Sequence, residues 1–513
     1  MNFKNLVYSR KSVFWVPVIV ILKAIILFIF LALSKQFTPE LVDGISIQSN
    51  DYSQLVDPVN NLVESGSYRL RSSSEPYAGR LPGYSFPYIF YRYLFAKSVA
   101  HQLLILSQIF LSAFAIFLFA KLVEEVSSKK MFYWTVILFS FFAYFIKDDL
   151  WTLSASFSAS TFMIHLYYTY KFIKYENNKD IFLSGLWMTW LFLLRPFTLL
   201  YFIVILLVLF AVYRNKIIYF LKIITLFLLP LLLFESFWIP RNYVNTGKII
   251  PLQVAYVPGQ NFKYVAGCGV DCVGKYSVVE VRKLVSAWGG NSLWFVPGTE
   301  LHWFLRERAN YDFSGYTFQN QSIFTKEFTI DSLLHLKRDL VASYDESLSF
   351  EERFSLDEIV VEKSRRYTKS YAASYPFNFY VVSHIKRLKI FLGVNVTADW
   401  PGPAFKEGPW FYSFYKLISL VFHLVLIFVV FVFPYLMIFN RSLRTKYSFI
   451  VAGYVYSLLF VFSFLVELAG ITYYITGFVG AYLLFLMLIG EWENWNVFPK
   501  KKRGEKNESI TLN

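Results

Sequence analysis

The sequence predicts an α-helical polytopic membrane protein, and its composition and the lengths of its apolar runs are the reasons. The chain has 513 residues, of which 56% are hydrophobic and 21% aromatic, and its mean hydropathy is +0.44. This is too apolar for an ordinary soluble protein. Runs of about 20 apolar residues without charges have the length needed to cross a hydrocarbon core of ~30 Å.

We expect about ten membrane-spanning helices, within two of that count. They are predicted at residues 13–34, 98–120, 131–146, 153–172, 181–194, 197–212, 217–238, 413–438, 447–466 and 471–489. The first run follows basic residues, as a secretion signal does. It lacks a small-x-small cleavage site before Asp43, which predicts a retained anchor.

The basic residues predict the orientation of these helices. One set of alternating loops and the carboxyl-terminal tail carry most of them: Lys121, Lys129, Lys130, Lys171, Lys174, Lys179, Arg214, Lys216, Arg441, Arg444, Lys446 and the run 500–503. The positive-inside rule therefore puts both termini in the cytoplasm. The net charge of +15 is explained by this topology, and no nucleic-acid partner is predicted. The abundance of Phe, Ile, Lys and Tyr favours a bacterial cytoplasmic (inner) membrane.

Five regions follow from this topology. They are a cytoplasmic amino terminus (1–12), a transmembrane module (13–238) containing an extracytoplasmic loop (35–97), an extracytoplasmic domain (239–412), carboxyl-terminal spans (413–490) and a cytoplasmic tail (491–513). We expect the domain to be mixed α/β or mainly α, with a helix at 354–373 beginning at Ser-Leu-Asp-Glu. The preceding acidic run, 345–352, is a solvated face or a helix start.

Cys268 and Cys272 close a short glycine-rich segment of the predicted extracytoplasmic domain. This setting favours a disulfide, with two free thiols as the alternative. A zinc site is disfavoured because no further Cys or His ligands lie nearby.

Carboxylates in the predicted outer loops are the first candidates for chemistry. A carboxylate near lipid headgroups has a raised pKa when it is shielded from water, which suits proton abstraction from a hydroxyl. Asp51 has this setting; Asp43 and Asp57 compete with it, and a solvated side chain or a helix cap is the alternative. The acidic pair Asp148 and Asp149 could orient an acceptor or hold a divalent cation, or it could cap the next helix.

Arginines at the predicted outer ends of spans are the second group: Arg80, Arg195 and Arg241. A guanidinium there works against the positive-inside bias, so a partner is expected. Phosphate suits its bidentate fork, whereas snorkelling or a salt bridge is the alternative. Lys23 lies in the middle of the first span and is expected to face protein. Walker, dinucleotide-binding, G-x-S-x-G and histidine metal motifs are missing from the sequence.

These segments resemble the GT-C superfamily of membrane glycosyltransferases, in its bacterial branch related to protein mannosyltransferases and the aminoarabinose transferase of lipid A. The resemblance is carried by Asp51-Tyr52, by Arg80-Leu-Pro-Gly-Tyr84, by Leu194-Arg-Pro196 and, most specifically, by Pro240-Arg-Asn-Tyr243 with its continuation to Leu252. It is spread over most of residues 13–490. The first loop lacks the Asp-Glu pair of the protein mannosyltransferases, which disfavours protein as the acceptor.

The resemblance implies transfer of a sugar from a polyprenyl-phosphate donor to a lipid, glycan or protein acceptor at the outer membrane face. It implies catalytic roles for Asp51 and for Asp148 or Asp149, and donor-phosphate binding by Arg80, Arg195 and Arg241. Substrate contacts are expected from Tyr52, Tyr84 and Asn242. A divalent cation is the one cofactor that the acidic turn suggests, and metal-free catalysis fits this turn equally. The alternatives are a polysaccharide (O-antigen type) polymerase and, with less in its favour, a lipid or glycan transporter.

Overall fold

The computed structural model is a helical protein in which apolar helices form one large bundle. It describes residues 14–49, 52–69, 81–247, 249–252, 275–288, 323–343, 345, 347–393, 410–440, 443–465 and 471–495. The bundle contains α2 (Trp15–Phe37), α5 (Lys97–Val126), α6 (Lys129–Phe141), α7 (Ala143–Leu150), α8 (Ala155–Tyr175), α9 (Asn178–Leu194), α10 (Leu199–Tyr213), α11 (Ile217–Thr246), α18 (Trp410–Phe439), α19 (Lys446–Phe460) and α20 (Ile471–Trp495).

Shorter elements connect these helices. The first loop contains a 3-10 turn (η1, Pro39–Leu41), strands β1 (Val42–Asp43) and β2 (Ser46–Ile47), and helices α3 (Tyr52–Ser65) and α4 (Ser85–Leu94). A second 3-10 turn (η2, Pro196–Thr198) precedes α10, and a π-helical turn (η8, Val461–Leu465) follows α19. Within the described residues the antiparallel pair β1–β2 is the only sheet.

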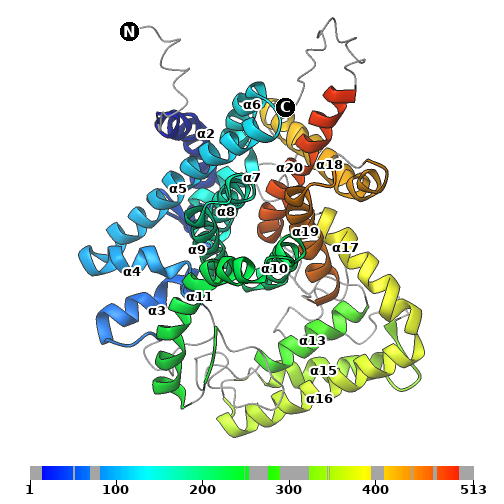
Figure 1. Ribbon diagram of the computed structural model, residues 1–513. Helices are drawn as coiled ribbons and strands as arrows, with labels where there is room; N and C mark the ends of the chain where they lie inside the picture. The colour runs from blue at the N-terminus through cyan, green and yellow to red at the C-terminus, as the bar shows by residue number, and fades with distance from the viewer. Residues whose placement is uncertain are drawn as a thin grey trace, which may run out of the picture.

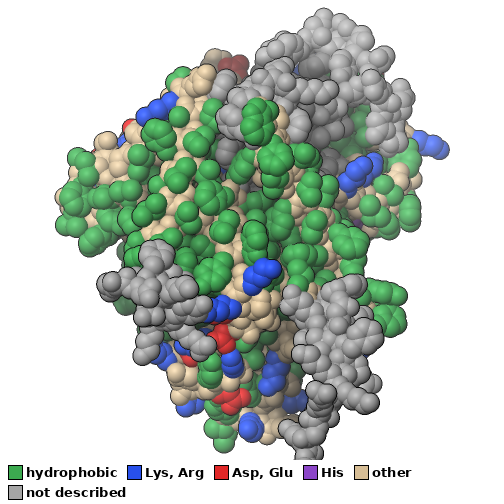
Figure 2. Space-filling model, turned by 90° about the horizontal axis from the view of Figure 1, so that it is seen from above, with side chains coloured by type: hydrophobic (Ala, Val, Ile, Leu, Met, Phe, Trp, Pro, Cys, Tyr) green, Lys and Arg blue, Asp and Glu red, His purple; other side chains and the backbone are tan. Residues whose placement is uncertain are grey.

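Six stretches of helix are long and apolar enough to cross a membrane. They are Trp15–Gln36, Lys97–Val126, Pro196–Tyr213, Ile217–Asn245, Ser413–Phe439 and Lys446–Phe464. In Figure 2, hydrophobic side chains cover the broad middle of the visible face, and charged side chains gather toward its lower end. A surface this apolar is unfavourable in water, so these features indicate a membrane protein.

The other four predicted spans also form helices, but they are less regular. Residues 131–146 break at Phe142, whose extended backbone separates α6 from α7. Helix α8 is long enough to cross, but buried hydroxyl side chains occupy its first turns, including Ser156, Ser158 and Ser160. Helix α9 has 17 residues. The apolar part of α20 is Ile475–Ile489.

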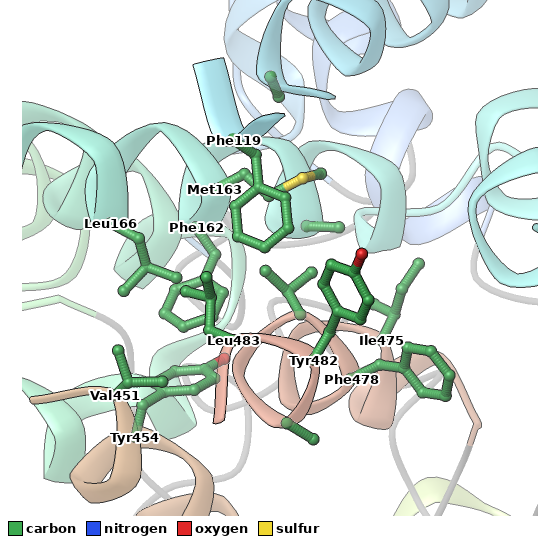
Figure 3. Packing of buried hydrophobic residues seen from close by; sticks show 14 of the residues in the cluster. Phe119, Phe162, Met163, Leu166, Val451, Tyr454, Ile475, Phe478, Tyr482 and Leu483 are labelled. Atoms are coloured by element: carbon green, nitrogen blue, oxygen red, sulfur yellow. The ribbon is translucent and has the colours of Figure 1, made fainter. Parts of the chain in front are cut away.

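Helix α8 lies at the centre of the bundle. Figure 1 shows α8 and α9 between α2, α5 and α6 on one side and α10, α19, α20 and α18 on the other. Phe162 of α8 stacks on Tyr454 of α19 with ring centroids 3.8 Å apart, and residues of α20 close the same core (Figure 3). Gly185 lets α9 approach α11, because a Cβ atom there would lie 2.1 Å from the carbonyl oxygen of Phe227.

A second helical cluster forms the described part of the predicted extracytoplasmic domain. It consists of α13 (Lys275–Ala287), α15 (Ile330–Ala342), α16 (Phe350–Ser374), a π-helical turn (η5, Asn378–Val382) and α17 (Ser383–Gly393). Its own hydrophobic core includes Leu284, Leu336 and Tyr367, whereas Phe391 and Leu392 of α17 belong to the core of the bundle. Its described residues are helical and contain no strand, and the choice between a mixed α/β and a mainly α domain stays a prediction.

The predicted start of the helix at 354 is wrong by four residues. The helix begins at Phe350 because Ser349 and Glu352 form a reciprocal capping box. The end of the acidic run is therefore a helix start.

Candidate functional site

The first loop after α2 is fastened to the turn that follows α7. Ile47 of β2 forms a parallel bridge with Trp151. The Thr152 N–H donates to the Ile47 carbonyl oxygen at 3.0 Å, and the Ser49 hydroxyl donates to the Thr152 carbonyl oxygen at 2.7 Å. The segment just before Asp51 and the segment just after Asp149 are therefore held side by side.

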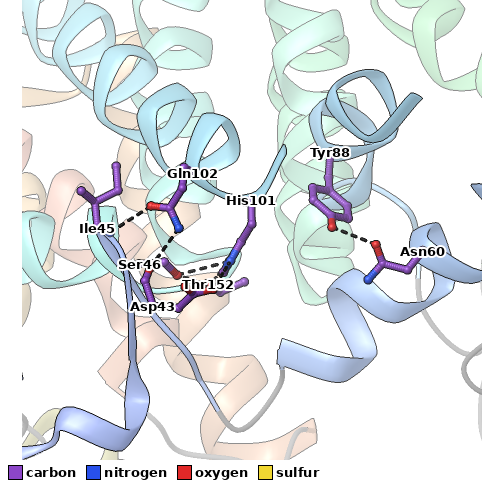
Figure 4. A network of polar contacts seen from close by, with 8 residues as sticks. All are labelled: Asp43, Ile45, Ser46, Asn60, Tyr88, His101, Gln102 and Thr152. Carbon is purple, nitrogen blue, oxygen red and sulfur yellow. Dashed lines mark hydrogen bonds and ion pairs between the residues drawn. The ribbon is translucent and has the colours of Figure 1, made fainter. Parts of the chain in front are cut away.

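His101, at the start of α5, is the centre of this contact. Its Nε2 atom lies 2.9 Å from Thr152 Oγ1 and 3.2 Å from Ser46 Oγ. Its Nδ1 atom lies 3.6 Å from a carboxylate oxygen of Asp43. The neighbouring Gln102 accepts from the Ile45 N–H at 2.9 Å and donates to the Asp43 carbonyl oxygen at 3.0 Å. Figure 4 shows these side chains converging from the β1–β2 hairpin, α5 and the turn after α7.

Asp51 lies outside the described residues, whereas its sequence neighbour Tyr52 is described. Tyr52 packs edge-on against His101, with ring centroids 5.1 Å apart. Burial, together with the carboxylates of Asp57 and Asp43, raises the pKa of Tyr52 to about 12. Burial also raises the pKa of the Asp57 carboxyl, against the lowering effect of Lys97. Asp51 is thus next in sequence to a tyrosine that lies among acidic side chains.

The acidic pair of α7 lies inside the bundle. Asp148 is 3% exposed and Asp149 is 1% exposed. Asp149 forms an ion pair with Lys23 of α2 and accepts a hydrogen bond from Ser156 at 2.6 Å. Lys23 also donates to Ser112 at 2.5 Å, and Ser112 lies midway along α5.

Two sequence predictions concern Lys23 and Asp149. Lys23 faces protein, as predicted, because it is fully buried. Asp149 is not the N-cap of the following helix, whose N-cap position is Ser154. Phe142 has an extended backbone that ends α6, and the buried acidic pair lies in the separate short helix α7 that follows.

Arg195 and the segment before α4 meet near the start of α8. Arg195 directly follows α9, is 7% exposed and donates to Ser158 at 3.4 Å. Gly83 packs directly on the end of α9, just before Arg195. A Cβ atom at position 83 would lie 2.5 Å from the carbonyl carbon of Leu193. Trp190 donates to the Gly83 carbonyl oxygen at 2.9 Å. Arg80 lies outside the described residues, three positions before Gly83.

Tyr84 is buried in a small hydrophobic cluster that unites these loops. It is 1% exposed and packs against Phe157 with ring centroids 5.7 Å apart. The cluster joins α3, α4, the start of α5, the start of α8 and the end of α9, and Tyr52 and Tyr68 pack against it. A substrate contact from Tyr84 would require this cluster to open.

Arg241, near the end of α11, is held by aromatic rings. Its guanidinium carbon lies 4.8 Å from the ring centroid of Trp238 and 5.3 Å from that of Tyr68. It donates to Asn242 Oδ1 at 2.7 Å and to the Tyr68 carbonyl oxygen at 3.4 Å. Asn242 is fully buried and donates to the Ile250 carbonyl oxygen at 2.8 Å. Asn242 therefore orients Arg241 and secures the chain beyond α11.

The predicted residues that the structure describes thus fall into neighbouring groups: Tyr84, Arg195 and Arg241 lie near helix ends, and Asp149 lies deeper, against Lys23. Helix α8 links two of them, since its first turns bind Asp149 and Arg195. Tyr68 links Arg241 to the cluster that contains Tyr84. Cys268 and Cys272 lie outside the described residues, so their pairing stays a prediction. Among the described residues no group of three or more His, Cys, Asp or Glu side chains is arranged to hold a metal ion.

Sequence reasoning missed His101 and Gln102. The six histidines are dispersed along the sequence and form no metal motif. The available signal was two adjacent polar residues in the first turns of an apolar helix, because such side chains need partners inside the protein. Gln108, farther along the same apolar helix, is another polar side chain that needs a partner, and it donates to the carbonyl oxygens of Asp149 and Trp151.

Comparison of the chain with protein-family models, curated proteins and solved structures finds no match.

Proposed function

We propose that this protein is a membrane glycosyltransferase that moves a sugar from a polyprenyl-phosphate donor to a lipid or glycan acceptor at the outer face of a bacterial cytoplasmic membrane. The observation that carries the proposal is the gathering of acidic and cationic side chains at one end of an apolar bundle. Asp43 and Tyr52 contact His101 near the start of α5, and Asp57 lies close to Tyr52. Arg195 follows Leu194 of the hydrophobic cluster around Tyr84, and Arg241 contacts Tyr68, which packs against that cluster.

The donor's chemistry matches this arrangement. A polyprenyl-phosphate sugar has an apolar tail, which belongs in the bilayer, and a phosphate, which needs cations at the membrane surface. Arg241 is the best-positioned phosphate ligand because Trp238 and Tyr68 hold its planar group. A fixed guanidinium can stabilise the charge that grows on a departing phosphate without reorganising during the reaction.

The proposed reaction is a direct displacement at the anomeric carbon. The acceptor hydroxyl oxygen forms a bond to that carbon while the bond from the carbon to the phosphate oxygen breaks. The hydroxyl proton passes to a carboxylate, for which Asp51 is the first choice, and polyprenyl phosphate leaves with the bonding electron pair. Attack opposite the leaving group inverts the anomeric configuration. Asp43 and Asp57 are the competing bases on the same loop.

In this proposal the two acidic residues of α7 have separate roles. Asp149 is neutralised by Lys23, so we assign it a positioning role: it anchors the turn that binds the first loop. Asp148 is kept as the second acidic position. A divalent cation would have to be held by groups beyond the described side chains or by the substrate phosphate.

The test uses purified protein in liposomes with a panel of polyprenyl-phosphate hexoses and pentoses and extracted membrane glycolipids as acceptors. Release of free polyprenyl phosphate is measured. Arg241→Gln should lower turnover by about 100-fold, the loss typical when one preorganised charge-stabilising group is removed. Arg366→Gln is the control because this arginine is exposed on α16 and pairs with Glu327. Failure of every donor, or equal turnover by the two variants, would contradict the proposal.

A further inference from the structure

Helix α4 exposes a stripe of large apolar side chains. Phe86, Phe90, Tyr93 and Leu94 are 41%, 63%, 62% and 60% exposed. Their spacing of four, three and one residues places them on one face of a helix. An exposed patch of this kind marks a binding surface.

The opposite face of α4 is fixed to the protein by polar contacts. Tyr88 donates to Asn60 Oδ1 of α3 at 2.9 Å (Figure 4). Arg92 donates to the same oxygen at 3.1 Å and to Glu64 at 2.7 Å. The Ser85 hydroxyl donates to the Leu55 carbonyl oxygen at 2.9 Å. These contacts fix the rotation of α4, so its apolar stripe must face away from α3.

The stripe is continuous with the apolar surface of a spanning helix. Phe86 packs edge-on against Phe234 of α11, with ring centroids 6.0 Å apart. On α11, Leu233 and Phe237 are 52% and 78% exposed. Figure 1 shows α4 at the edge of the molecule, outside α5.

The length of α4 limits how it can meet a bilayer. Its 10 residues extend only about 15 Å at 1.5 Å per residue, which is half of the ~30 Å hydrocarbon core. It cannot span, yet only Phe95 and Ala96 separate it from α5. A short helix with one polar and one aromatic face is suited to the headgroup boundary, where its apolar face dips into the acyl chains.

We propose that α4 is an interfacial helix whose partner is the lipid surface of the bilayer that the bundle crosses. Phe90, Tyr93 and Leu94 insert below the headgroups, while Arg92 and its partners on α3 face the aqueous side. The first loop is thereby tied to the depth of the membrane surface. This inference does not depend on the proposed transfer reaction.

The test places an environment-sensitive fluorophore on single cysteines, in a background with Cys268→Ser and Cys272→Ser, in proteoliposomes. Phe90→Cys reports the stripe, Phe237→Cys is the control in the spanning helix, and Glu362→Cys, exposed on α16, is the aqueous control. We expect blue-shifted emission at position 90, with stronger quenching by lipids carrying a nitroxide near the headgroup than by lipids carrying it near the chain end. Position 362 should be quenched by neither lipid.

Two results would overturn the proposal. Emission at position 90 as red as that at 362 would mean that water covers the stripe. Blue-shifted emission without quenching by either lipid would mean that protein covers it, such as a second copy of this chain. A photo-crosslinking residue in place of Tyr93 provides a second measurement that leaves both native cysteines intact. It should form lipid adducts, and exclusive adducts with protein would also overturn the proposal.

Discussion

The buried ion pair between Lys23 and Asp149 offers the sharpest test of how the acidic turn is held. Both side chains lie inside the protein, with 0% and 1% exposure. Removing Lys23 as Lys23→Met leaves the Asp149 carboxylate buried without its cation. Breaking a buried pair in this way costs about 3–5 kcal/mol. Breaking an exposed pair costs less than about 1 kcal/mol, because water solvates the remaining charge.

The molecule contains a matched exposed pair. Lys174 of α8 pairs with Glu125 of α5, and their side chains are 41% and 45% exposed. Lys174→Met therefore removes the same chemical group from the same kind of helix contact in a solvated setting. The free energy of unfolding can be measured for both variants by reversible denaturation in mixed detergent micelles. We expect Lys23→Met to lose at least about 2 kcal/mol more than Lys174→Met.

A double-mutant cycle separates pairing from other effects of Lys23. Asp149→Asn keeps a side-chain oxygen for Ser156 but removes the charge. Because the double variant leaves no unpaired charge, Lys23→Met and Asp149→Asn together should cost about 2–3 kcal/mol less than the sum of the single changes. Additive losses, or a Lys23→Met loss no larger than that of Lys174→Met, would refute the assignment of this pair as the anchor of the turn.

Three further predictions concern the surrounding loops. Gly83→Ala should destabilise the protein by about 1–3 kcal/mol in the same denaturation assay, because the added Cβ meets rigid backbone of α9; an unchanged midpoint would contradict the close packing. His101→Ala should speed hydrogen exchange of the amides at 42–49, since it leaves the hydroxyls of Ser46 and Thr152 without their shared partner. His335→Ala, at an exposed position of α15, should leave that exchange unchanged. In a difference titration against Tyr52→Phe, the Tyr52 phenol should ionise near pH 12 instead of 10. The wild type should therefore lose stability relative to the variant as the pH rises from 10 through 12. Ionisation near pH 10 would contradict the burial of Tyr52.

Residue patterns predicted most of the helices but not the irregular turn at Phe142. Apolar runs in α2, α5, α10, α11, α18 and α19 have one interpretation, because only a spanning helix needs such a length without charge. The run at 131–146 has the same local pattern. The break at Phe142 leads into α7, whose Asp149 pairs with Lys23, and such a contact between residues distant in sequence is invisible in the local pattern.

The site was predicted unevenly for the same reason. The resemblance singled out Arg241 and Asn242, and the two side chains do contact each other. The sequence indicated that Lys23 must face protein, but spacing cannot identify a partner more than a hundred residues away. His101 was missed because its partners come from three segments, the β1–β2 hairpin, α3 and the turn after α7, which only the folded chain brings together.

The central claim is that a carboxylate on the first loop activates the acceptor for sugar transfer. It is tested most directly by Asp51→Asn, with Asp43→Asn and Asp57→Asn in parallel, after confirming equal protein levels in the membrane. The measured quantity is incorporation of radiolabelled sugar into extracytoplasmic glycans and lipids of cells that depend on this protein. We expect Asp51→Asn to abolish incorporation, while Asp345→Asn, at an exposed site shortly before α16, retains it. Full incorporation in all three loop variants would contradict the account.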